Sequence, residues 1–176
     1  MLRVGVVVWL ASELMFFAGL FAGYFALRAA NDHWPPEGVE LEVGRTAIAT
    51  AILVASSFTM HVAVVAAERR DERRAVRWTV ATVVLGGVFV ANQAAEYAGL
   101  AFTYTTHAYG SIFYLMTGFH GLHVIGGLVL MLAVLGVGVG PTSRLPLEDP
   151  LTVTEFYWHF VDVVWLAMFA TIYLLK

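Results

Sequence analysis

Cysteine is absent from this chain of 176 residues, and its absence excludes disulfides, thiolate metal sites and cysteine nucleophiles. Charged residues are scarce, at 13% against the ~25% of an average soluble domain, while 60% of the residues are hydrophobic. The net charge of −3 is too small to suggest a nucleic-acid partner. The connections between apolar segments are short, so no soluble catalytic domain or nucleotide-binding loop is expected.

Five apolar segments are each long enough to cross a bilayer, which requires about 20 apolar residues in a helix. The segments are Val4–Ala30, Arg45–Ala67, Trp78–Ala101, Gly110–Gly138 and Thr152–Leu175. Helix breakers and charges separate them: Trp34-Pro35-Pro36, the charge run Glu68–Arg77, and the prolines between Pro141 and Pro150. We therefore expect an all-α, polytopic membrane protein in which residues 1–176 form one domain, a bundle of five transmembrane helices.

The distribution of basic residues predicts the orientation of the bundle, because cytoplasmic loops carry an excess of arginine and lysine. One side of the membrane receives Arg3, the five arginines between Arg69 and Arg77, and Arg144. The other side receives Arg28, Arg45 and Lys176, with Asp32, Glu37, Glu40 and Glu42 nearby. The amino terminus should be cytoplasmic and the carboxyl terminus outside. The charge run is interpreted as a solvated turn that anchors this topology, with a partner-binding patch as the alternative.

Eight titratable side chains lie within or beside the apolar segments, and we interpret them as an intramembrane polar network. Placing a charged group in a bilayer costs about 2.5–3.5 kcal/mol on insertion scales, so such groups usually face a partner helix, a polar cavity or an ion path. We expect the eight to point into protein neighbours and to carry no redox centre. They are Glu13, His61, Glu96, His120, His123, Glu155, His159 and Asp162.

Glu13 is the one carboxylate in the first segment. At 1.5 Å per residue it lies about 15 Å from the cytoplasmic end of that helix, near the middle of the membrane. His123 lies at a similar depth in the fourth segment. We predict a hydrogen bond between Glu13 and His123, with His61 as the alternative partner. Two roles remain open for Glu13: a protonated acid that joins two helices, or a group that handles protons.

Helical spacing brings other polar residues onto shared faces. His120 and His123 are three residues apart, which permits metal binding if other helices add ligands, but we favour hydrogen-bonded packing. In the last segment, Glu155, His159 and Asp162 form a polar face. This face should pack inward or against a partner subunit, because a lipid-facing helix would not carry it.

Six motifs follow one another along the chain: Ser12-Glu13-x-Met15-Phe16-Phe17, Trp34-Pro35-Pro36, Gln93-x-x-Glu96-Tyr97, Tyr109-Gly110-Ser111, Gly118-Phe119-His120-Gly121-Leu122-His123-Val124 and Tyr157-Trp158-His159-Phe160-Val161-Asp162-Val163-Val164-Trp165. Motifs of this kind occur in the same order in subunit III of cytochrome c oxidase, within the haem–copper oxidase superfamily. The chain resembles that family over essentially its whole length.

The resemblance implies a non-catalytic accessory subunit of an aerobic respiratory oxidase in a bacterial cell membrane. It implies that haems and copper are held by subunits I and II, that cytochrome c donates electrons to the complex, and that this chain binds no cofactor except structural phospholipid. Subunit I would be the main contact, with subunit II and a small subunit in the same complex. The implied roles are support of proton uptake, lipid binding and turnover stability.

At single positions, the resemblance makes Glu13 the candidate for the family's carbodiimide-reactive carboxylate. It also places His120, His123, His159 and Asp162 in the family's intramembrane polar network, none as a metal ligand. The usual subunit has seven helices, and the five expected here match the last five, so one wall of the family's lipid cleft is missing.

Two other functions are consistent with the sequence. One is an accessory subunit of a quinol oxidase or a nitric oxide reductase, because these residues do not indicate which electron donor the complex uses. The other is an independent haem-binding or proton-translocating membrane protein, in which His61, His120, His123 and His159 would offer haem ligands and the buried carboxylates would relay protons.

Overall fold

The computed structural model describes residues 2–138 and 147–175, and in these ranges the regular structure is entirely helical. The helices are α1 (Leu2–Ala29), α2 (Val43–Glu68), α3 (Glu72–Gly99), α4 (Ala108–Gly138) and α5 (Glu148–Phe169), with α5 continuing into the π-helical turn η1 (Ala170–Leu174). All five are long and apolar enough to cross a membrane. The predicted all-α membrane fold is therefore confirmed.

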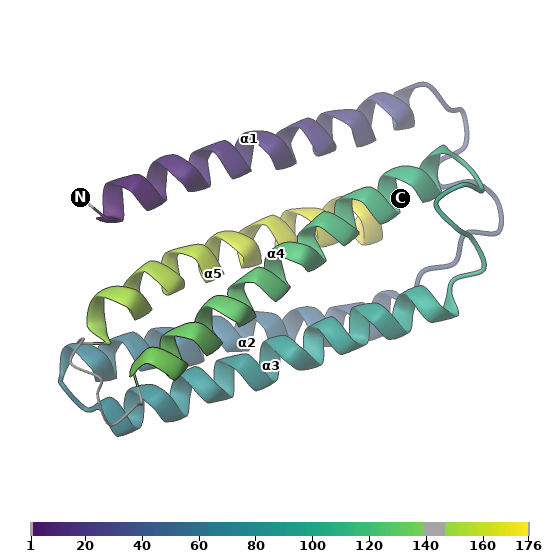
Figure 1. Ribbon diagram of the computed structural model, residues 1–176. Helices are drawn as coiled ribbons and strands as arrows, with labels where there is room; N and C mark the ends of the chain where they lie inside the picture. The colour runs from purple at the N-terminus through teal and green to yellow at the C-terminus, as the bar shows by residue number, and fades with distance from the viewer. Residues whose placement is uncertain (1, 139–146, 176) are drawn as a thin grey trace.

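The five helices run side by side in three layers (Figure 1). The α2–α3 hairpin forms one layer, α4 and α5 form the middle layer, and α1 lies on the far side of the middle layer and contacts only α4 and α5 closely. Within the most apolar part of each helix, 56% of α5 is buried, against 6% of α1. On the polar and aromatic face of α5, Trp158, Asp162 and Trp165 are buried, whereas the His159 side chain is 43% exposed.

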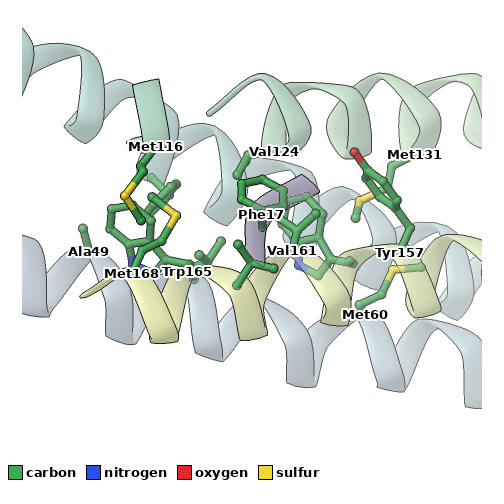
Figure 2. Close-up of a cluster of buried hydrophobic side chains, with 14 of the residues drawn as sticks. Phe17, Ala49, Met60, Met116, Val124, Met131, Tyr157, Val161, Trp165 and Met168 are labelled. Atoms are coloured by element: carbon green, nitrogen blue, oxygen red, sulfur yellow. The ribbon is translucent and has the colours of Figure 1, made fainter. Parts of the chain in front are cut away.

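Large aromatic and methionine side chains fill the space between the layers (Figure 2). Trp158 and Trp165 of α5 are fully buried, and their indole N–H groups donate to Ser56 Oγ and Thr50 Oγ1 of α2, each at 2.9 Å. Hydroxyl groups of α2 thereby satisfy the only polar atom of each indole, which would otherwise lose a hydrogen bond on burial.

Each helix starts earlier in the chain than its apolar segment predicts, and α3 and α5 do so by more than two residues. Only Arg69–Asp71 form the turn between α2 and α3, and Glu72–Arg77, expected as part of a charged turn, is helical. Asp71 explains this start, because its carboxylate accepts a hydrogen bond from the backbone N–H of Arg74 at 3.1 Å and so caps the helix. The start of α5 at Glu148 places Pro150 in the first turn, where a missing N–H costs little.

The connection between α1 and α2 packs onto the end of the bundle opposite to the α2–α3 turn (Figure 1). Trp34, which precedes Pro35 by a cis peptide bond, stands edge-on to the rings of Tyr24 and Tyr109, at centroid distances of 5.5 and 5.0 Å. Arg144 and Lys176, which count in the orientation argument, lie outside the described residues, as do Pro141 and Pro146, which help to separate the last two apolar segments.

Candidate functional site

The predicted hydrogen bond between Glu13 and His123 is present and joins α1 to α4. Glu13 Oε2 lies 3.2 Å from His123 Nε2, and His123 Nδ1 lies 2.7 Å from the carbonyl oxygen of Phe119. Because a carbonyl oxygen only accepts, Nδ1 carries hydrogen. The Nε2 contact therefore contains one proton, either on an imidazolium that donates to a carboxylate or on a carboxyl group that donates to neutral imidazole. The alternative partner, His61, lies elsewhere.

A second group consists of four contacts that share members, three of which link α2 to α5. His61 Nδ1 lies 2.8 Å from Glu155 Oε1, and the same oxygen lies 3.5 Å from His159 Nε2. The other nitrogen of His159, Nδ1, lies 3.0 Å from Ser57 Oγ. Ser57 in turn donates to Asp162 Oδ2. We call these five residues the relay.

The two ends of the relay differ in exposure. The side chain of His61 is 65% exposed and that of His159 43%, whereas the Glu155 side chain is 14% exposed. Asp162 is buried, and its second oxygen, Oδ1, has no hydrogen-bond partner among the described residues. The arrangement connects an accessible imidazole to a carboxylate inside the bundle.

Glu96 belongs to a third group, at the carboxyl-terminal end of α3. Its carboxylate accepts hydrogen bonds from Tyr173 Oη at 2.9 Å and from Gln93 Nε2 at 3.3 Å, and Thr46 Oγ1 lies at 3.4 Å. Nearby, Arg45 donates to Asn92 Oδ1 at 2.7 Å. These contacts fasten η1 and the start of α2 to α3, which is a structural use of a buried carboxylate.

His120 differs from the other histidines, because it is fully buried and neither ring nitrogen has a hydrogen-bond partner within residues 2–138 and 147–175. Its ring stacks on Trp165 with a centroid distance of 4.9 Å and meets the edge of Phe89 at 6.0 Å. It shares no neighbour with His123 that could complete a metal site. The described part of the chain contains no group of three or more histidine, aspartate or glutamate side chains able to hold a metal ion.

The eight predicted side chains thus occupy four separate places instead of one continuous network. Glu13 pairs with His123; His61, Glu155, His159 and Asp162 belong to the relay; Glu96 and His120 each lie apart. Sequence reasoning missed Ser57, Thr46 and Tyr173, which supply the hydroxyl contacts. The adjacent Ser56 and Ser57 in the second apolar segment were the signal that the sequence offered.

Comparison with known proteins agrees with the resemblance seen in the sequence. A family model described as cytochrome c oxidase subunit III matches residues 1–176. "Probable cytochrome c oxidase subunit 3" of Nocardia farcinica is 49% identical over 181 residues, which cover 100% of this chain and 89% of the relative. The protein of the same name from Mycobacterium tuberculosis H37Rv is also 49% identical, with the same coverage.

A more distant relative, "Cytochrome c oxidase subunit 3" of Thermostichus vulcanus, is 41% identical over 172 residues, covering 97% of this chain and 86% of the relative. These relatives are bacterial, and the five helices of the chain are long and apolar enough to span a membrane, so the chain is a multi-pass protein of a bacterial plasma membrane. The chain belongs to the cytochrome c oxidase subunit III family, whose members are accessory subunits of haem–copper oxidases and work in complex with other oxidase subunits.

Proposed function

We propose that this chain, acting as a single domain, packs beside subunit I of its oxidase and supports proton uptake by that subunit. In this proposal, subunits I and II hold the haems and copper. Cytochrome c donates the electrons, as the name cytochrome c oxidase subunit 3 of the relatives suggests. The observation that carries the proposal is the relay from His61 to Asp162.

Every member of the relay can both accept and release a proton. A proton bound at the exposed imidazole of His61 can pass to Glu155, because His61 Nδ1 lies 2.8 Å from Glu155 Oε1. The same carboxylate oxygen lies 3.5 Å from His159 Nε2. From His159, the Ser57 hydroxyl at 3.0 Å leads to the carboxylate of Asp162. Glu155 and Asp162 are seven residues apart on α5, so the relay covers about 10 Å of membrane depth.

The direction of transfer follows from the proposed orientation of the bundle. His61 lies toward the turn between α2 and α3, which carries Arg69, Arg70, Arg73 and Arg74 on or beside it. The positive-inside rule puts that turn, and with it the amino terminus, on the cytoplasmic side. The exposed end of the relay would then collect protons from the cytoplasm, the side from which an oxidase takes them up.

The partly exposed relay also supports a contact surface. An imidazole that is 43% exposed, such as that of His159, is costly against lipid, at several kcal/mol if charged. A neighbouring subunit that covered the seam between α2 and α5 would remove this cost and receive protons from it. We assign this seam to subunit I, with subunit II, a small subunit and structural phospholipid elsewhere around the complex.

The substitution Asp162→Asn tests the relay in the purified oxidase complex. It keeps the size and polarity of the side chain but removes the titratable group, so we expect several-fold slower proton uptake and a shorter enzyme lifetime during turnover. Haem spectra and initial oxygen reduction with cytochrome c should be retained. Glu96→Gln is the matched control, because it changes a buried carboxylate at the opposite end of the bundle and should leave proton uptake unchanged.

The complex prepared without this chain provides the second arm of the experiment. It should still reduce oxygen but should lose activity faster during turnover. Equal uptake rates and lifetimes for the wild type, Asp162→Asn and the complex lacking the chain would refute the proposed function.

A further inference from the structure

Two adjoining cavities open on either side of the first turns of α3. One, of 550 Å³, lies against α2 and is lined by residues that include Arg69, Arg74 and Val65. The other, of 610 Å³, includes Arg73, Arg74 and Arg77. Arg74 lines both, so they form one continuous surface, which we call the basic groove, defined by Arg69, Arg73, Arg74, Arg77 and Trp78.

The charge of the basic groove is largely uncompensated. Its four arginines are exposed, and no ion pair connects any of them to a carboxylate elsewhere in the part of the chain that the structure describes. The one carboxylate in the lining, Asp71, already accepts the backbone N–H of Arg74 as the cap of α3. Four guanidinium groups thus remain available to an anion, and their forked N–H groups suit phosphate oxygens.

Apolar surface continues from the groove toward the membrane interior. Val62, Val65 and Ala66 line the side against α2, and Ala81 follows Trp78 on the other side. Tryptophan is enriched at the level of lipid headgroups, where its ring is apolar and its N–H polar. The groove therefore offers charge at the membrane surface and hydrocarbon contact beneath it, a combination that a small soluble anion would use only in part.

We propose that the basic groove binds the phosphate headgroup of an anionic phospholipid, with the acyl chains lying along α2 and α3. This site adjoins the exposed end of the relay, because His61 also lines the cavity against α2. It does not depend on the proposed function, since it needs only the arginines and the adjacent apolar surface. The charge run Glu68–Arg77 would then bind a lipid in addition to anchoring the topology.

Native mass spectrometry of the delipidated oxidase complex, titrated with phosphatidylglycerol or phosphatidylcholine, tests the proposal. The wild type should prefer phosphatidylglycerol. Each arginine near a membrane surface strengthens binding of anionic lipid by roughly fivefold, so Arg74→Gln should weaken phosphatidylglycerol binding about fivefold and Arg74→Gln/Arg77→Gln by at least about tenfold. Glutamine is about as good a helix former as arginine, so α3 should persist.

The control Arg28→Gln/Arg45→Gln removes the same charge at the other end of the bundle and should bind phosphatidylglycerol as the wild type does. Unchanged affinity in the groove variants would overturn the proposal, as would the absence of a phosphatidylglycerol preference in the wild type. Displacement of the lipid by millimolar inorganic phosphate would identify a soluble-anion site instead. Loss of another subunit with lipid retained would identify a protein contact and would likewise overturn the lipid assignment.

Discussion

Glu13 and His123 hold one proton between them at the junction of α1 and α4. The pair is largely buried but remains partly accessible, since the Glu13 side chain is 24% exposed and the His123 side chain 16%. The ring of Phe17 stands edge-on to His123 at a centroid distance of 5.0 Å, and Tyr157 Oη donates to the His123 carbonyl at 2.9 Å. A carboxyl group that shares a proton in such surroundings is accessible to an apolar reagent that requires the protonated acid.

Glu13→Ala should therefore abolish labelling of this chain by a hydrophobic carbodiimide, because the reagent reacts with protonated carboxyl groups in apolar environments. Oxygen reduction by the complex should remain largely intact, since in our proposal subunits I and II, and not this chain, hold the redox centres. Mass spectrometry of the labelled subunit measures the first effect and an oxygen electrode the second. Glu96→Gln serves as the control and should be labelled as the wild type is; labelling that survives Glu13→Ala would contradict the assignment.

At the scale of single residues, sequence reasoning succeeded where depth alone decides a contact. The regular helical rise places Glu13 and His123 at the same level, and their hydrogen bond follows. It could not find Ser57 or Tyr173, because serine and tyrosine give little hydropathy signal in a membrane segment and their partners depend on how each helix is rotated. The same rotation separates His120 from His123, although the two are one turn apart.

At the scale of helices, the contact of α3 and α4 with α5 depends on two glycines that flank Trp158. A Cβ atom at Gly127 of α4 would lie 2.8 Å from the Trp158 ring, and one at Gly86 of α3 would also lie 2.8 Å from it. The ring has little freedom to move, because it is fully buried and its N–H is bonded to Ser56. The space for the Trp158 ring therefore depends on the absence of a side chain at Gly86 and Gly127.

Gly127→Ala should destabilise the bundle by about 1–3 kcal/mol, the usual cost of overpacking a filled core. Thermal unfolding in detergent, followed by circular dichroism, measures the change as a lower melting temperature. Gly87→Ala is the control, because a Cβ there would meet no atom within 4 Å, and alanine is the better helix former. That variant should melt at or slightly above the wild-type temperature; equal melting of both variants would count against the packing argument.

The helix ends show what apolar segments alone do not predict. Hydropathy locates the part of a helix that faces lipid, and all five segments were found in this way. It does not detect where a helix continues into water, so the charged turns Glu72–Arg77 of α3 and Glu148–Leu151 of α5 were assigned to connections. Capping by Asp71 and the tolerance of a first helical turn for proline decide those ends, and both are local effects.

At the scale of the whole molecule, the two ends of the bundle differ in kind. One end carries the α2–α3 turn, the basic groove and the exposed His61, which also lines the groove; the other carries Glu96 with its structural contacts. The number of helices and the motifs of the family could be predicted from the sequence. The division of eight polar residues among four places could not, because it depends on which helices are neighbours, and α1 reaches only the middle layer.

The polarity of the bundle has functional meaning only if the relay opens toward the cytoplasm, and the absence of cysteine makes this directly measurable. Single variants Glu37→Cys and Glu72→Cys place thiols at exposed positions near opposite ends. In intact spheroplasts, a membrane-impermeant maleimide should label Glu37→Cys at once, whereas Glu72→Cys should react only after permeabilisation, and the unsubstituted chain should not react in either condition. The reverse pattern would place His61 toward the outer face, where an oxidase takes up no protons, and the relay could then not serve uptake.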